Sequence, residues 1–170
     1  SIARRAGFNI TAIHYYFSTK EKLYNTVLRI SFQRLVDVIL EVVDNTNKLP
    51  GEVLEDLVDS YVDYMNKNQD FVRIVLRELA SGGHRVGPII QEVFQTRGGP
   101  PPQKVIHIIE RGIREGQLRR VDPSQTVVNL VALCLFHFLA RPFVKAVIGM
   151  DNDAEFIEKR KNSINLWRHI

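Results

Sequence analysis

The feature that most constrains the fold is a stretch, from about residue 20 to residue 44, in which apolar residues recur every three or four positions. The recurring positions are Leu23, Val27, Ile30, Leu35, Val38, Ile39 and Val42. This spacing places them along one side of an α-helix, and it differs from the alternation of a half-buried β-strand. At 1.5 Å per residue, such a helix is about 37 Å long, enough to run from one end of a small protein into its body.

Helical periodicity returns along the rest of the chain. Helices are predicted over about residues 50–67, 70–79, 86–95, 103–115 and 123–147, and from 153 to the end. Pro50 and Pro123 suit the first turn of a helix, and Asp122 suits the N-cap position before Pro123. Gly116 suits the position just after a last turn. Pro142 is expected to break or bend its helix. No segment shows sustained strand alternation, so the sequence predicts an all-α protein.

A shorter helix is predicted over residues 10–17, with Asn9 as its N-cap. The next helix has two possible starts. Ser18 can form a capping box with Glu21, or Thr19 can serve as the cap one residue later. The stretch from residue 8 to residue 23 therefore reads as the second half of a helix-turn-helix.

Residues 1–28, SIARRAGFNITAIHYYFSTKEKLYNTVL, resemble the DNA-binding segment of tetracycline-repressor (TetR) family transcription regulators. The shared features are an I-A-x-x-A-G helix, a capped recognition helix that ends in Y-Y-F, and a following helix that starts T-K-E-x-L. His14 stands where most members of that family carry Tyr. The resemblance implies contacts of Thr11, Ala12 and His14 with base edges. It also implies phosphate contacts from Tyr15, Tyr16 and Lys20.

A helix-turn-helix needs a first helix that covers the inner faces of the other two. In the family this helix precedes the segment that opens the present chain, so we expect a truncated N-terminus. The domain organisation expected from the resemblance is a partial helix-turn-helix DNA-binding domain over 1–29 and a helical ligand-binding and dimerisation domain over 30–170.

Positive charge is concentrated at the N-terminal end. The chain has 23 Lys and Arg residues against 19 Asp and Glu residues, a net charge of +4. Residues 1–29 hold five cations and one anion, so the remainder of the chain is neutral overall. A basic end on a neutral body is typical of a protein that meets DNA with that end, although a solvated basic face is the simpler alternative.

Other functional classes find little support in the sequence. The five histidines are scattered over different predicted elements without metal-ligand spacing, and no glycine-rich phosphate loop follows a strand. We therefore predict no enzymatic activity, no cofactor and no metal. The single cysteine, Cys134, is expected to be a buried apolar residue, which is compatible with the cytoplasm. The uncharged run 123–140 is expected to be too polar and too short to span a membrane.

A small-molecule pocket is a further hypothesis. The candidates are bulky apolar or amphipathic residues on helices that the resemblance places around an effector pocket: Tyr61, Tyr64, Met65, Phe71, Phe94, Phe136, His137 and Arg141. Ordinary core packing is the alternative for each. His137 and Arg141 lie one helical turn apart among apolar neighbours and need polar partners, of which a ligand carboxylate is one candidate.

The predicted helix over 123–147 is apolar on nearly every side, which a surface helix cannot be. Burial within the subunit can cover one face, and a second subunit can cover another. TetR-family regulators dimerise through their two C-terminal helices, so the resemblance implies a homodimer.

The function predicted from these features is transcriptional regulation, most often repression in this family. The partners would be a near-palindromic double-stranded DNA operator and a small hydrophobic or amphipathic effector. The effector would tilt the helix over 20–44 and release the operator. The alternative is an all-α protein that binds a small molecule or a partner but not DNA.

Overall fold

The computed structural model describes residues 15–45, 47–149 and 153–164. These ranges contain the helices α3 (Lys20–Val43), α4 (Pro50–Lys67), α5 (Gln69–Ala80), α6 (Val86–Thr96), α7 (Pro101–Arg114), α8 (Pro123–Ile148) and α9 (Asp153–Ile164). No strand occurs within them, which confirms the predicted all-α class.

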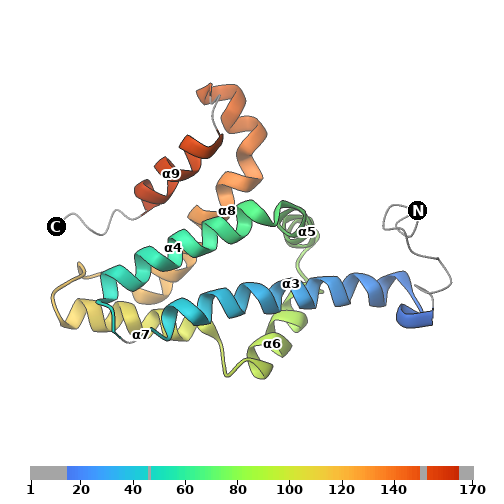
Figure 1. The fold of residues 1–170 in the computed structure, drawn as a ribbon, viewed down its shortest axis with the longest axis horizontal. Helices are drawn as coiled ribbons and strands as arrows, with labels where there is room; N and C mark the ends of the chain where they lie inside the picture. Colours follow the sequence, from blue (N-terminus) through green and yellow to red (C-terminus); the bar gives the residue numbers. More distant parts are fainter. Residues whose placement is uncertain (1–14, 46, 150–152, 165–170) are drawn as a thin grey trace.

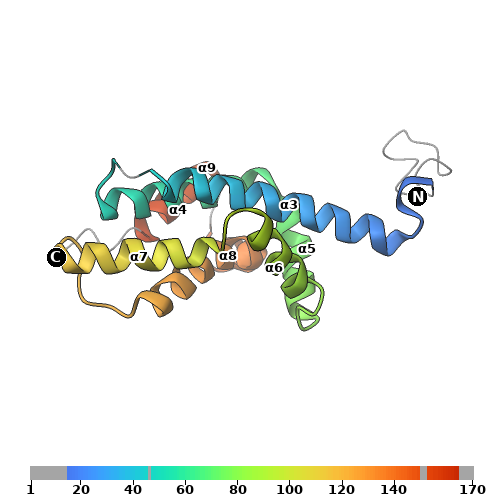
Figure 2. The same ribbon diagram turned by 90° about the horizontal axis from the view of Figure 1, so that it is seen from below.

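The body is arranged around α3, which runs along the length of the molecule (Figure 1). α4, α5, α6 and α7 all pack against α3. α8 packs against α4, α5 and α7, and α9 covers α4 and α8. In two perpendicular views the first turns of α3 extend beyond α5 and α6 toward the N-terminal end (Figures 1 and 2). α3 therefore joins that end of the chain to the helical body.

Local side-chain chemistry sets where the long helices begin. Thr19 caps α3, because its hydroxyl oxygen accepts a hydrogen bond from the backbone N–H of Lys22 at 3.1 Å. Ser18 lies outside the helix with a φ of +55°, so the capping box predicted for Ser18 is wrong and the alternative cap at Thr19 is confirmed. The carboxylate of Asp122 accepts from the backbone N–H of Gln125 at 2.7 Å and caps α8 as predicted.

Two predicted helix starts and one predicted break are corrected. α5 begins at Gln69, and Asp70 lies in its first turn, where it pairs with Arg73 at 3.1 Å. α7 begins at Pro101 instead of residue 103, since a proline in the first turn forfeits only an N–H that has no helical partner. α8 continues through Pro142 without the expected break.

The end of α7 illustrates a glycine stop that the sequence predicted correctly. Gly116 has a φ of +70°, and its N–H donates to the carbonyl of Ile113 at 3.2 Å. The N–H of Gln117 donates to the carbonyl of Gly112 at 2.9 Å. This pair of hydrogen bonds satisfies the last carbonyls of the helix and turns the chain toward α8.

The core lies where α3, α4 and α7 meet. Its most deeply buried side chains include Leu28, Val53, Leu54, Val58, Val62 and Ile109. Each aliphatic side chain removed from water contributes about 1.5–3 kcal/mol to folding. At Gly112 the helices approach so closely that an added Cβ would lie 2.5 Å from the Leu118 side chain and 3.0 Å from Pro50.

α9 is attached to α4 by an ion pair as well as by apolar packing. The buried ammonium of Lys161 lies 2.7 Å from Asp63 on α4 and 3.2 Å from Glu158. Burial alone would lower the pKa of Lys161, but the hydrogen bonds to these two carboxylates outweigh it and raise the pKa. Lys161 thus stays charged and holds α9 in place.

Candidate functional site

Aromatic and basic side chains face solvent at the N-terminal end of the described chain. Residues 15–17 are helical, and Tyr15 and Tyr16 are 82% and 76% exposed. Their rings pack edge to face with centroids 5.3 Å apart. Lys20 is exposed at the first position of α3. Phenol hydroxyls and an ammonium in this setting can donate to phosphate oxygens. The other predicted DNA-binding residues, Thr11, Ala12 and His14, lie outside the described residues.

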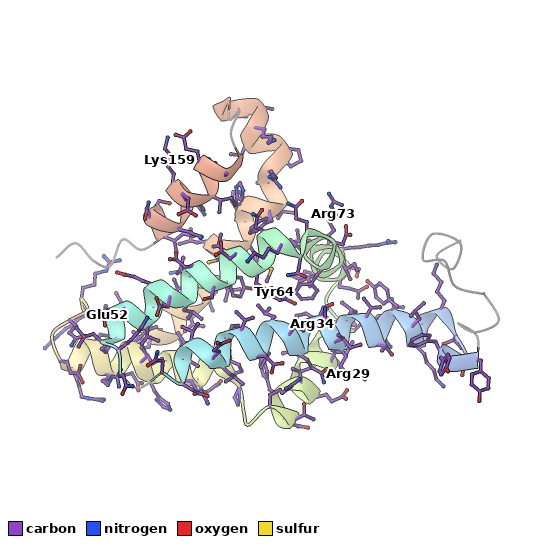
Figure 3. All side chains as sticks on the ribbon, viewed as in Figure 1. Arg29, Arg34, Glu52, Tyr64, Arg73 and Lys159 are labelled. Carbon is purple, nitrogen blue, oxygen red and sulfur yellow. The ribbon has the colours of Figure 1, made fainter. Side chains whose placement is uncertain are left out.

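Ion pairs tie one side of α3 to α6 and α7. They join Arg29 to Glu92 at 3.0 Å, Asp37 to Arg97 at 2.9 Å and Asp44 to Lys104 at 2.6 Å. Arg29 projects from α3 on the side of α6 (Figure 3). These exposed pairs stabilise the protein by at most about 1 kcal/mol each. Spaced along the helix, they favour one rotation of α3 relative to the body.

An apolar cavity of about 70 Å³ lies between α3, α4, α7 and α8. Its wall is made of Ile39, Leu57, Val58, Tyr61, Pro101, Pro102, Val105, Val127, Leu130, Val131 and Cys134. Burial raises the pKa of the Cys134 thiol to about 12 and the pKa of the Tyr61 phenol well above its usual value. Both groups are therefore neutral at physiological pH, and none of the lining side chains carries a charge. Such a cavity suits a small uncharged molecule.

Of the eight residues predicted to line a ligand pocket, all lie within the described ranges and Tyr61 borders this cavity. Met65 and Phe71 belong to the core, and Phe94 packs half-buried against it. The hydroxyl of Tyr64 donates to the backbone carbonyl of Ser31 at 2.8 Å, so Tyr64 joins α4 to α3. The structure does not bring these side chains together around one space.

The three candidates on α8 also lie away from the cavity. Phe136 is 56% exposed on the outer side of the helix. His137 is buried, and its ring centroid lies 4.6 Å from that of Phe156 on α9 and 5.2 Å from that of Phe138. Arg141 is half-buried one turn further along. The burial of His137 follows from the packing of α9 on α8.

The sequence reasoning missed most of the residues that line the cavity because it selected bulky side chains. Large side chains fill the space between helices, and a void remains where the facing side chains are short or rigid. Here these are residues such as Pro101, Val105, Val127 and Cys134. Small residues at facing positions are a usable signal only after the pairing of α7 with α8 is known.

A second, more polar hollow of about 380 Å³ lies where α8 begins and α9 ends. Its polar lining comes from Arg119, Asp122, Gln125, Thr126, Asn129 and Ser163. The sequence reasoning did not predict this hollow. No group of three or more His, Cys, Asp or Glu side chains that could hold a metal ion occurs in the part of the chain that the structure describes.

α8 has apolar side chains on opposite faces. Leu130 and Cys134 are buried against the rest of the subunit, as is the polar side chain of His137. The outer face exposes Val128, Phe136, Leu139, Phe143 and Val147. By length and composition the segment Pro123–Val147 could cross a membrane, and only 17% of an 18-residue apolar window within it is buried. The uncharged run over 123–140 is only part of this helix, which continues through Arg141 and Lys145. A single helix of this kind does not indicate a membrane span.

Solved structures share this arrangement of helices. A TetR family transcriptional regulator, PfmR from Thermus thermophilus, superposes with a TM-score of 0.71 over 96% of this chain and 83% of its own. A proposed fatty acid metabolism regulator from Clostridium perfringens gives a TM-score of 0.74, over 97% of this chain and 83% of its own. A TetR/AcrR family regulator from Thermobifida fusca gives 0.69, over 96% and 82%. Each is 18% identical in sequence. This chain and the three solved structures thus share one helical fold.

A family model described as the C-terminal domain of tetracyclin repressor-like proteins matches residues 50–165. The chain therefore belongs to the tetracycline-repressor (TetR) family of transcriptional regulators. This confirms the family suggested by the first 28 residues, from a different part of the chain. No curated protein matches the sequence.

Proposed function

We propose that the protein is a homodimeric, DNA-binding transcriptional repressor that a small apolar effector releases from a near-palindromic operator. The observation that carries the proposal is the continuity of α3 over Lys20–Val43. This helix begins at the exposed Lys20, shortly after the exposed Tyr15 and Tyr16. Ile39, near its other end, lines the apolar cavity. A ligand in the cavity can therefore act on the same rigid element that carries the DNA-binding end.

The proposed DNA-binding part comprises residues 1–29, and residues 30–170 form the ligand-binding and dimerisation part. Tyr15, Tyr16 and Lys20 would contact phosphates, while Thr11, Ala12 and His14 would face base edges in the major groove. The boundary falls within α3, where Leu28 is already buried in the body. A continuous helix across the boundary supports mechanical coupling between the two parts.

The proposed effector is a small, uncharged and mainly apolar molecule. This is narrower than the hydrophobic or amphipathic class expected from the sequence, because no charged side chain lines the cavity. A buried carboxylate without a partner is costly, so a free fatty acid is not favoured there. The role in fatty acid metabolism that is described for the Clostridium perfringens protein is therefore not proposed for this chain.

The proposed homodimer places the outer face of α8 at a two-fold axis. Exposed apolar side chains along several turns, including Phe136, Leu139 and Phe143, fit a self-complementary interface. Two recognition helices can read adjacent major grooves only at a separation of about 34–36 Å, one turn of DNA. The same assembly would cover the face that otherwise resembles a membrane span, in keeping with a cytoplasmic protein.

Operator binding by the full-length protein tests the proposal. Genomic fragments would be selected by mobility shift, and affinity would be measured by fluorescence anisotropy over a range of salt concentrations. Lys20→Ala should weaken binding to all fragments alike and lower the salt slope by about 1, because a phosphate contact carries no base information. Lys159→Ala, on the outer side of α9 (Figure 3), is the matched control and should change neither. Failure to bind any fragment would favour a small-molecule or partner-binding protein that does not use DNA.

A further inference from the structure

The first two turns of α3 lie outside the hydrophobic core. Leu28 is the first buried residue of the helix, and residues 20–27 are half-buried or exposed. Figure 2 shows this segment extending beyond α5 and α6. It is about 12 Å long, so a tilt of about 10° at Leu28 would move Lys20 by about 2 Å. The direction of the segment therefore depends on side-chain contacts close to Leu28.

A polar network lies at this place. The hydroxyl of Tyr24 on α3 donates to the carboxylate of Glu78 near the end of α5, with 2.8 Å between the oxygens. Arg85, between α5 and α6, places its guanidinium 3.7 Å from Glu78 and 3.7 Å from Glu21 in the first turn of α3. The same guanidinium lies 5.9 Å from the centre of the Tyr24 ring.

Glu78 is only 6% exposed, and this burial gives the network a defined geometry. A buried carboxylate is costly unless donors surround it, and moving Tyr24 away would remove a donor at 2.8 Å. The backbone carbonyl of Glu78 accepts from the N–H of Gly83 at 2.8 Å, so the end of α5 is itself closed and fixed. Burial and the hydrogen bond to Glu78 raise the pKa of Tyr24, which keeps its phenol a donor at physiological pH.

We propose that Tyr24, Glu78 and Arg85 form a clamp that sets the direction of the first two turns of α3 and thereby positions the DNA-binding end. These are positioning residues that do not themselves touch DNA. α5, which supplies Glu78, packs against α4 and α8, and both of those helices line the apolar cavity. The inference concerns DNA binding and so rests on the proposed function, but the clamp can be tested without DNA.

Pulsed electron–electron double resonance, which measures the distance between two spin labels, tests the clamp directly on the full chain. Spin labels at Lys22→Cys on α3 and Gln103→Cys on α7 would report the tilt of the exposed segment. Labelled protein diluted into unlabelled protein keeps the measurement within one subunit. The buried Cys134 thiol, whose pKa is raised to about 12, should stay unlabelled. Tyr24→Phe should shift or broaden the distance distribution by about 2 Å, the displacement that a small tilt gives over about 12 Å of helix.

Tyr64→Phe is the matched control. It also removes one tyrosine hydroxyl that joins α3 to another helix, here the Tyr64 hydroxyl of α4 that donates to the carbonyl of Ser31. This hydrogen bond acts on the part of α3 held in the body. The distance distribution of this variant should remain that of the parent. A Tyr24→Phe distribution identical to the parent, or an equal change in the two variants, would overturn the clamp.

Operator affinity supplies the second readout. Tyr24→Phe and Glu78→Gln should weaken operator binding by about 5–20-fold, within the range of coupling between distant sites, while Tyr64→Phe should not. Glu78→Gln keeps the shape of the side chain, so a folding defect in one variant leaves the other as a test. If the parent binds no DNA, the proposed function fails, but the distances between the spin labels still test whether the clamp sets the direction of α3. If the parent binds and both variants bind equally well, the clamp does not position the DNA-binding end.

Discussion

α3 and α8 are the two longest helices described, with 24 and 26 residues, yet they meet their surroundings in different ways. α3 buries one apolar stripe, which includes Leu28 and Phe32. Charged side chains on another side of α3 form ion pairs with residues of α6 and α7 or next to them. α8 buries one stripe and leaves the opposite one, including Phe136 and Phe143, exposed and apolar.

The difference indicates different roles for the two helices. α3 finds its partners within the subunit, so it can act as a rigid connection between the cavity and the N-terminal end. α8 has a second apolar face that water alone would cover in a monomer. An exposed apolar surface of this extent marks an interaction site, and a second copy of the same helix would cover it.

The largest effect is expected from truncating a side chain in the buried stripe of α3. Leu28→Ala should lower the free energy of unfolding by about 2–5 kcal/mol, because it removes buried methyl groups and leaves a cavity. Leu139→Ala, on the exposed stripe of α8, is the matched change. It should lower the unfolding midpoint in a way that depends on protein concentration, as expected for an interface residue. Urea denaturation at several protein concentrations distinguishes the two cases.

A charge on the outer face of α8 should separate the subunits. Phe136→Glu would bury an unpaired carboxylate in the interface and should raise the dissociation constant of the dimer by about 100-fold or more. Sedimentation equilibrium measures this constant. Ser124→Glu, exposed in the first turn of the same helix, adds the same charge outside the stripe and should leave it unchanged. A parent protein that is monomeric at micromolar concentration would contradict the assigned role of α8.

The helix on which both α3 and α8 rest offers a smaller test. α7 contacts both of them, and at Gly112 it lies close to Leu118 and to Pro50 of α4. Gly112→Ala should destabilise the protein by about 1–3 kcal/mol, because the new methyl group has no room. Gly51→Ala, with nothing within 4 Å, should be neutral or slightly stabilising. Equal thermal midpoints for the two variants would show that the close approach at Gly112 is not constrained.

The smallest effect concerns the ion pairs along α3. A double-mutant cycle on Arg29 and Glu92 should give a coupling of about 0.2–1 kcal/mol that falls with added salt, since both side chains are partly exposed. Chemical denaturation at low and high ionic strength measures it. A coupling that does not depend on salt would indicate a desolvated pair and a tighter attachment of α3 to α6.

Features that depend on a few neighbouring residues could be predicted from the sequence. The cap at Asp122, the glycine stop at Gly116 and the limits of α4 are settled by local hydrogen bonds and by proline geometry, and each was predicted correctly. At Ser18 and Thr19 two adjacent residues could both cap a helix, and the backbone conformation decided between them.

Features that depend on which helix faces meet could not be predicted. The cavity lies between four helices, and the residues that border it are short ones such as Val105 and Val127. Tyr64 donates a hydrogen bond to α3 and His137 packs against α9, and these contacts are set by the tertiary arrangement. The contact between Tyr24 and Glu78 joins residues 54 positions apart, and no local pattern indicates it.

The central claim is that α3 couples the apolar cavity to the DNA-binding end. Its most direct test is calorimetric titration of the protein with a small uncharged apolar ligand, found by screening compounds such as benzene, in the absence and presence of operator DNA. If α3 couples the two sites, the operator should weaken ligand binding by the same factor by which the ligand weakens operator binding, about 5–150-fold. Equal ligand affinities in the two titrations would contradict it.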